Sequence, residues 1–241
     1  PVAAAAPQPP LAASVSAASF AEAALAGGGE GESEGEGAER VAGLVELHFR
    51  ALPPRQAEAH ARYYAARVPL QSSPAPGAPR PPPLDGRALA RYVVRWCTEL
   101  LRGLRWSLSY YLDGVPSWDW YFPYHHSPLL VDVAALLSLD PAAGSAAWAP
   151  SVPLRPFEQL LSVLPASGAR HLPPPHAQLL LAACDPAGSH PLSVYYPRDY
   201  MIEKDPKGRP WRDLALLPFL DVAALLDAVA ALPPPPPADA A

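Results

Sequence analysis

The acidic residues in the centre of the sequence are the first candidates for hydrolytic chemistry, because Mg²⁺ in nucleases and phosphatases is held by several oxygen ligands at once. Asp113, Asp119, Asp132 and Asp140 stand singly in the sequence rather than in a cluster. Only Asp119 lies within a dense motif, and we interpret it as a cap or an arginine partner rather than as a metal ligand. The sequence therefore predicts no metal site and no catalytic carboxylate in this chain.

Histidine and cysteine also lack the spacing of a zinc or nucleophile site. His125 and His126 are adjacent, so they point in different directions in a helix or strand, and we expect one of them to bond to a backbone carbonyl. Cys97 and Cys184 lie far apart, which disfavours a disulfide framework and favours a reducing compartment. The motifs G-x-x-x-x-G-K-[ST], G-x-G-x-x-G and G-x-S-x-G are missing. We expect no catalysis by this chain alone.

Aromatic residues supply the chemistry that the sequence does suggest. Residues 105–128 read R-W-S-L-S-Y-Y-L-D-G-V-P-S-W-D-W-Y-F-P-Y-H-H-S-P and contain three tryptophans and five other large aromatic residues. Such side chains either fill a core or offer flat faces on which bases stack. Trp118 and Trp120 are the candidate stacking residues, and the alternative is that both are core.

Five arginines lie beside this aromatic stretch. Residues 40–112 carry eleven arginines and four acids, a net charge of +7, although the whole chain has a net charge of −5. On a helix over 87–112 the five would fall within an arc of about 80°. Like charges four residues apart repel one another, so a stripe without internal partners would suit an external anion such as the backbone of single-stranded RNA. The alternative is an ordinary solvated face. The candidate RNA-binding arginines are Arg87, Arg91, Arg95, Arg102 and Arg105.

The elements that would position these residues are mostly helices. Residues 87–112 form the clearest one, with apolar residues at 89, 93, 96, 97, 100, 104, 108 and 111 and with Asp85 as a possible N-cap. Residues 41–49 could be helix or strand. We expect further helices over 56–68, 129–139, 157–164 and 172–181, an extended segment over 193–200, a turn over 205–211, and a short extended piece followed by a helix after Asp221 within 214–232.

Composition sets the limits of the folded part. Residues 1–39 are almost entirely Ala, Gly, Pro, Ser and Glu, and we expect a disordered low-complexity tail there. Residues 40–232 would form one mainly α domain with a Pro-rich insert at 72–86, Pro-rich loops and few short strands, followed by a disordered Pro-rich tail at 233–241. No run is long enough to span a membrane, so we expect a soluble piece of a longer protein, without a membrane partner.

The aromatic stretch resembles the signature of the Xrn family of 5′→3′ exoribonucleases, G-L-x-W-V-L-x-Y-Y-Y-x-G-x-x-S-W-x-W-Y-Y-P-Y-H-Y-A-P. The segments A-R-Y-Y-A-A-R-V (61–68), P-F-E-Q-L-L-S-V-L-P (156–165) and A-L-L-P-F-L-D (215–221) also match in order, and the resemblance covers about residues 58–230. The chain departs from the pattern at Leu112, His126, Ser127 and the insert at 72–86.

The resemblance implies that this chain is the helical second half of the conserved catalytic region. In that family the preceding half holds the Mg²⁺ ions and the pocket for the 5′ phosphate, so this segment would bind no cofactor and be inactive alone. Its role would be to close the RNA channel and to stack the 5′ nucleotide of 5′-monophosphorylated RNA on Trp118 or Trp120. The missing nuclease half would be its partner, and nuclear residence is favoured over cytoplasmic. The alternative is a non-catalytic RNA-binding or scaffold remnant.

Overall fold

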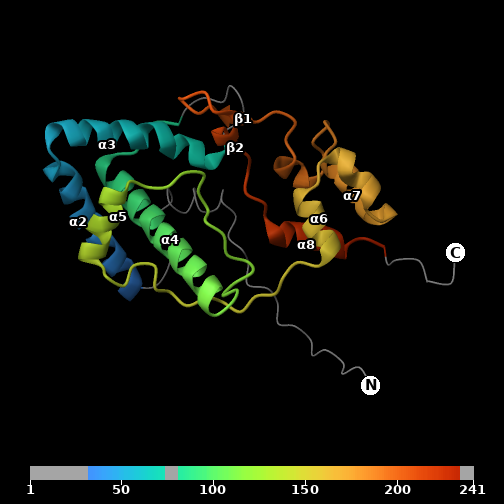
Figure 1. Cartoon of the computed structure of the whole chain (residues 1–241), viewed down its shortest axis with the longest axis horizontal. Coiled ribbons are helices and arrows are strands. Elements are labelled where there is room, and N and C mark those ends of the chain that lie inside the picture. The colour runs from blue at the N-terminus through green and yellow to red at the C-terminus, as the bar shows by residue number, and fades with distance from the viewer. Residues whose placement is uncertain (1–31, 74–80, 234–241) are drawn as a thin grey trace, which may run out of the picture.

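The computed structural model describes residues 32–73 and 81–233, and these residues form a mainly helical protein, as expected (Figure 1). The sheet among them is one antiparallel pair, β1 (Met201–Glu203) and β2 (Leu214–Leu216). The helices are α2 (Glu32–Ala51), α3 (Pro54–Arg67), α4 (Gly86–Leu112), α5 (Leu130–Leu139), α6 (Pro156–Val163), α7 (Pro174–Ala183) and α8 (Val222–Ala230), with the 3₁₀ helices η1 (Val68–Ser72), η2 (Ala166–His171), η3 (Pro191–Tyr195) and η4 (Pro210–Arg212).

The helices form two groups that lie side by side in Figure 1. In the first group, α2 and α5 pack against α4, and the core holds Tyr64, Val93, Trp96, Cys97, Val133 and Leu136. In the second group, α6, α7 and α8 enclose a core of mostly leucine side chains. The β1–β2 hairpin lies beside the C-terminal end of α3, at the top of the view. No helix in the described ranges is long and apolar enough to cross a membrane.

The central helix forms as the sequence predicts. The Asp85 side chain accepts a hydrogen bond of 2.7 Å from the Ala88 amide and caps α4. Asp113 follows the last turn, and Gly114 takes a φ of +96° that side chains with a Cβ rarely adopt. Asp221 caps α8 in the same way through the Ala224 amide. Local capping chemistry therefore fixes the ends of both helices.

The expected apolar face of α4 is only partly buried. Val93, Trp96 and Cys97 are in the core, but Leu104 and Leu108 are each 60% exposed and Tyr111 is 83% exposed. The prediction that one continuous face is buried is wrong for this end of the helix, because α2 and α5 cover only its first half. Cys97 is a core residue as predicted, and burial raises the pKa of its thiol to about 12.

Two other boundaries differ from those expected. Helix α2 begins at Glu32, so residues 32–39 are helical rather than part of a disordered tail; Glu39 at their end pairs with Arg87 and Arg91 of α4. The segment over 193–200 is not extended throughout, since Pro191 starts the 3₁₀ helix η3, which runs to Tyr195. The remaining tail residues, 1–31 and 234–241, and residues 74–80 of the insert lie outside the described residues.

Candidate nucleic-acid interface

The loop that carries Trp118 and Trp120 is held by serine side chains. The buried Ser117 hydroxyl accepts hydrogen bonds from the amides of Trp120 (3.2 Å) and Asp119 (3.3 Å). The Ser151 hydroxyl accepts one of 2.6 Å from the Trp118 amide and lies 3.3 Å from the Ser117 hydroxyl. These bonds hold the backbone of the loop in place, and with it the positions from which the two tryptophan side chains leave the chain.

Trp120 is part of the packed structure. Its indole N–H donates to the Glu99 carboxylate at 3.0 Å, and its ring meets the Trp148 ring edge to face with centroids 5.2 Å apart. The Arg102 guanidinium lies 5.9 Å from the Trp120 ring and 4.9 Å from the Trp148 ring. The partners of Trp120 thus come from α4 and from the segment after α5, and they leave it little freedom to meet a ligand.

Trp118, by contrast, is 54% exposed, and its indole makes no ring contact or hydrogen bond with the rest of the described chain. Trp106, like Trp120, is part of the packed structure, since its indole N–H donates to the Ser117 carbonyl at 3.0 Å and its ring stacks on Tyr110. Of the two candidate stacking residues, the structure therefore leaves only Trp118 with a free indole plane. The Asp119 carboxylate accepts no hydrogen bond in the described part, so its expected role as cap or arginine partner is wrong; burial raises its pKa.

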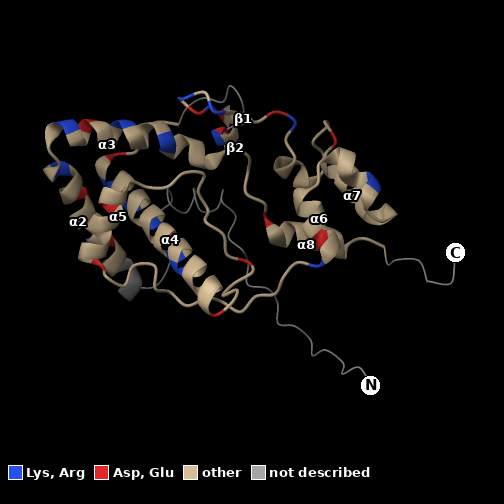
Figure 2. Ribbon diagram, in the orientation of Figure 1, with Lys and Arg blue, Asp and Glu red and all other residues tan. Residues whose placement is uncertain are grey.

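Figure 2 shows the basic residues of α4 as blue bands along the helix. Contrary to expectation, four of the five arginines have partners within the described residues. The neighbouring α2 helix supplies carboxylates that a projection of α4 alone could not place. Within α4, Glu99 lies three residues before Arg102 and pairs with it. Only Arg95 of the five makes no ion pair or hydrogen bond within the described residues, and it is exposed. RNA contact by the five stays a prediction. The observed pairs are Arg87 with Glu39 and Glu46, Arg91 with Glu39, Arg102 with Glu99, and Arg105 with the Ser145 and Ala146 carbonyls.

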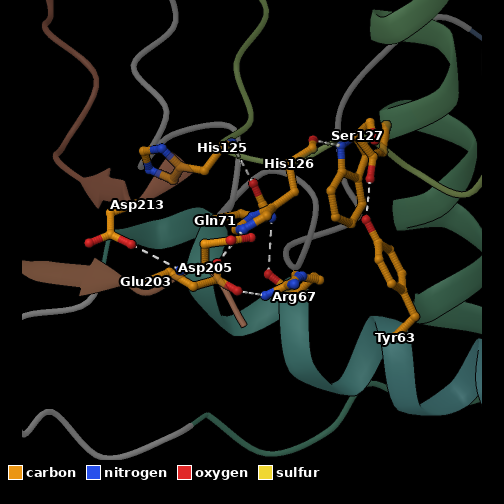
Figure 3. A network of polar contacts seen from close by, with 10 residues as sticks. Tyr63, Arg67, Gln71, His125, His126, Ser127, Glu203, Asp205 and Asp213 are labelled. Atoms are coloured by element: carbon orange, nitrogen blue, oxygen red, sulfur yellow. Dashed lines mark hydrogen bonds and ion pairs between the residues drawn. The ribbon is translucent and has the colours of Figure 1, made fainter. Parts of the chain in front are cut away.

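A second polar network joins the C-terminal end of α3 to the hairpin (Figure 3). The Gln71 carbonyl oxygen accepts from the His125 amide at 2.7 Å, so the Gln71 NH₂ group is the one that faces His126 Nδ1 at 3.1 Å. His126 Nδ1 must then accept, and His126 Nε2 donates to Glu203 at 2.5 Å. Glu203 also pairs with Arg67. The expected hydrogen bond from one of the two histidine rings to a backbone carbonyl is not found within the described residues; His125 instead meets the Ser73 hydroxyl.

Acidification from pH 7 to pH 5 is expected to destabilise the protein by about 2 kcal/mol through His126 alone. Burial, with the Arg67 charge, lowers the pKa of His126 to about 4, against about 6.5 when the ring is unfolded. Below pH 6.5 the unfolded chain binds a proton at this ring that the folded chain does not bind. The stability that depends on a neutral His126 is therefore fully present above pH 6.5 and is lost as the pH falls to about 4. Urea unfolding of the wild type and of His126→Gln at both pH values measures it.

The stability difference between these two proteins should narrow by about that amount at the lower pH, because glutamine has no ring to titrate. The Gln159→Ala variant is the control, since Gln159 is exposed and carries no titratable group, so its stability difference from the wild type should not change with pH. A pH-independent difference for His126→Gln would show that the ring carries no lowered pKa.

Metal chemistry has no candidate site here. Within residues 32–73 and 81–233, no group of three or more His, Cys, Asp or Glu side chains is arranged to hold a metal ion. The described residues therefore offer no group of ligands for Mg²⁺, which the resemblance assigns to the preceding half.

Comparison with known proteins assigns the family. The family model for the Xrn1 helical domain matches residues 87–235, more than half of the chain, and the chain belongs to this family. It is 39% identical over 138 residues to 5′-3′ exoribonuclease 2 of Cryptococcus neoformans, a match that covers 57% of this chain and 11% of the relative. It is 37% identical over 171 residues to 5′-3′ exoribonuclease 2 of Candida albicans, covering 70% of this chain and 15% of the relative. This chain therefore spans only a small part of the curated relatives that it matches.

Several residues that shape this site carried little sequence signal. Glu99 could have been assigned from its position three residues before Arg102, a spacing that places two side chains on one helix face. Ser151 and Trp148 could not, because they meet the tryptophan loop across about thirty residues that include the whole of α5. No periodicity describes contacts of that kind.

Proposed function

We propose that this chain is the non-catalytic helical part of a 5′→3′ exoribonuclease that degrades 5′-monophosphorylated RNA, and that Trp118 stacks the 5′ nucleotide. The observation that carries the proposal is the contrast between the two tryptophans of the loop. Trp118 presents a free indole from a backbone that Ser117 and Ser151 hold in place, while Trp120 is committed to Glu99 and Arg102. An exposed indole on a held backbone suits base stacking because the chain itself needs little ordering on binding.

The exposed end of α4 supports the second part of the proposal, that a nuclease half packs here and the RNA channel is closed between the two. Leu104, Leu108, Tyr111 and Leu112 follow one another at helical spacing and are 60%, 60%, 83% and 72% exposed. A row of large apolar side chains left in water is typical of an interaction surface. It adjoins the loop of Trp118, so a partner that covers this end of α4 would enclose that indole.

The remaining parts of the proposal concern what lies outside this chain. Mg²⁺ would be held by the nuclease half, since the described residues offer no site for it. The segment alone would be inactive. Nuclear rather than cytoplasmic residence stays a prediction.

Mixing this chain with a separately produced nuclease half is expected to restore digestion of 5′-monophosphorylated RNA that neither piece performs alone. The Leu108→Asp variant should lower that restored rate at least tenfold, because a charge would be buried against an apolar partner. Leu47→Asp is the matched control, because Leu47 is 58% exposed on α2, away from the Trp118 loop. Restored activity that is equal for both variants would contradict docking at α4, and digestion by the nuclease half alone would contradict the need for this segment.

A further inference from the structure

The tip of the β1–β2 hairpin carries a second exposed indole. Residues 204–213 read K-D-P-K-G-R-P-W-R-D, with four basic and two acidic residues and a formal net charge of +2. Trp211, in the short η4 helix, is 79% exposed, compared with 54% for Trp118. None of the aromatic contacts of the described residues involves it. A tryptophan that buries so little of its surface contributes little to folding through burial.

The hairpin tip is nevertheless well ordered by its own hydrogen bonds. Asp205 accepts from the Arg209 guanidinium at 2.7 and 3.1 Å and from its amide at 3.3 Å. Asp213 accepts from Lys204 at 2.7 Å and from the Asp205 amide at 2.9 Å. The Arg209 and Lys204 hydrogen bonds hold the pKa values of Asp205 and Asp213, respectively, below their usual range. Trp211 is therefore an exposed side chain on a turn whose backbone is held by several hydrogen bonds.

The base of the hairpin is also anchored. Glu203, the last residue of β1, pairs with Arg67 of α3 and with His126 (Figure 3). Leu216 of β2 is buried. The hairpin is thus fixed to the first helical group, and the position of its tip follows from that attachment.

The charges left over at the tip are positive. Both acids are neutralised by Arg209 and Lys204, whereas Lys207 and Arg212 are exposed and form no ion pair within the described residues. Trp211 therefore shares the ten-residue hairpin tip with two exposed cations, one four residues before it and one directly after it in sequence. A ligand that has flat rings along a negatively charged backbone fits an exposed indole with nearby cations. Sites for single-stranded nucleic acid are of this kind, because bases stack on aromatic rings and phosphates pair with cations. Protein–protein interfaces are also rich in tryptophan, but they are depleted in lysine, and their buried centres are depleted in charged residues.

This site is separate from the Trp118 loop. In Figure 1 the hairpin lies at the top of the view, while α4 runs downward and ends at the bottom, where the Trp118 loop begins. We propose that the hairpin tip is a second contact for single-stranded RNA, in which a base stacks on Trp211 and neighbouring phosphates pair with Lys207 and Arg212. This inference rests on the proposed function only in taking RNA as the ligand.

The test is the affinity of the whole chain for a 3′-labelled single-stranded RNA of about 16 nucleotides, the upper end of such site sizes, by fluorescence anisotropy. Trp211→Ala should weaken binding about tenfold, and Trp211→Phe should restore most of the loss because it keeps a ring. The double variant Lys207→Gln with Arg212→Gln should reduce the salt slope of log K by about 1.4, the value for two phosphates on a single strand. Ile202→Ala, at an exposed position of β1 outside the tip, should change neither quantity.

Unchanged affinity of Trp211→Ala, or no binding by the unmodified chain, would overturn the inference. Loss of association with the nuclease half, with RNA affinity intact, would overturn it in favour of a protein contact. The Trp118→Ala variant separates the two proposals, since a loss confined to Trp118→Ala supports the proposed function and rejects the hairpin site, and a loss confined to Trp211→Ala does the reverse. Because Trp211 is exposed, far-UV circular dichroism should show the same helix content for every variant.

Discussion

Replacing Asp132 with alanine is expected to lower the free energy of unfolding by about 3–5 kcal/mol, the cost of leaving buried partners of a charged group unpaired. The Asp132 side chain is inaccessible to solvent and receives the Tyr64 hydroxyl at 2.5 Å and His60 Nε2 at 3.1 Å. His48 Nε2 lies 3.8 Å away and has no hydrogen-bond partner among the described residues. One carboxylate thus joins α2, α3 and α5, and its removal would strand polar groups on two other helices. Chemical denaturation measures the change.

Two further variants make this result specific. Asp132→Asn keeps the shape and one acceptor oxygen, so it should cost less than alanine. Asp227→Ala, at an exposed position on α8 with no side-chain partner in the described chain, should change stability by no more than about 0.5 kcal/mol. A loss for Asp132→Ala as small as that of Asp227→Ala would mean that the buried network contributes nothing net.

The two tryptophans of the loop are expected to respond in opposite ways to replacement by alanine. Trp118→Ala should weaken single-stranded RNA binding by about 1–3 kcal/mol, roughly 5- to 140-fold, with almost no change in stability. Trp120→Ala should instead destabilise the fold by roughly 2–4 kcal/mol, because a partly buried ring is lost and the Glu99 carboxylate loses a donor. Anisotropy and thermal unfolding of the same two variants measure both effects.

Trp118→Phe should keep most of the affinity and serves as the matched variant, since phenylalanine retains a stacking face. Equal RNA affinity for Trp118→Ala and the wild type, at unchanged stability, would remove the stacking role. A fall in affinity for Trp120→Ala measured well below its melting temperature would show that the pinned indole also meets RNA.

The sequence predicted the start of those helices that begin with an aspartate cap. Asp85 caps the start of α4 and Asp221 the start of α8, because each cap relies only on residues within one turn. The segment around 41–49 was open between helix and strand, and the structure makes it part of α2. Its burial against α4 decides this, since Ala42 and Val45 are both 1% exposed.

The family also follows from the sequence alone, because a dense aromatic motif with fixed spacing survives as a pattern of residue types; the family match confirms it. Tertiary structure decided the partners of the side chains. Arg87 and Arg91 meet Glu39 from a helix that lies far away in sequence, and Trp120 is pinned while Trp118 is free. Helical periodicity states which way a side chain leaves its own helix, but the charge or ring that it meets depends on how distant segments pack.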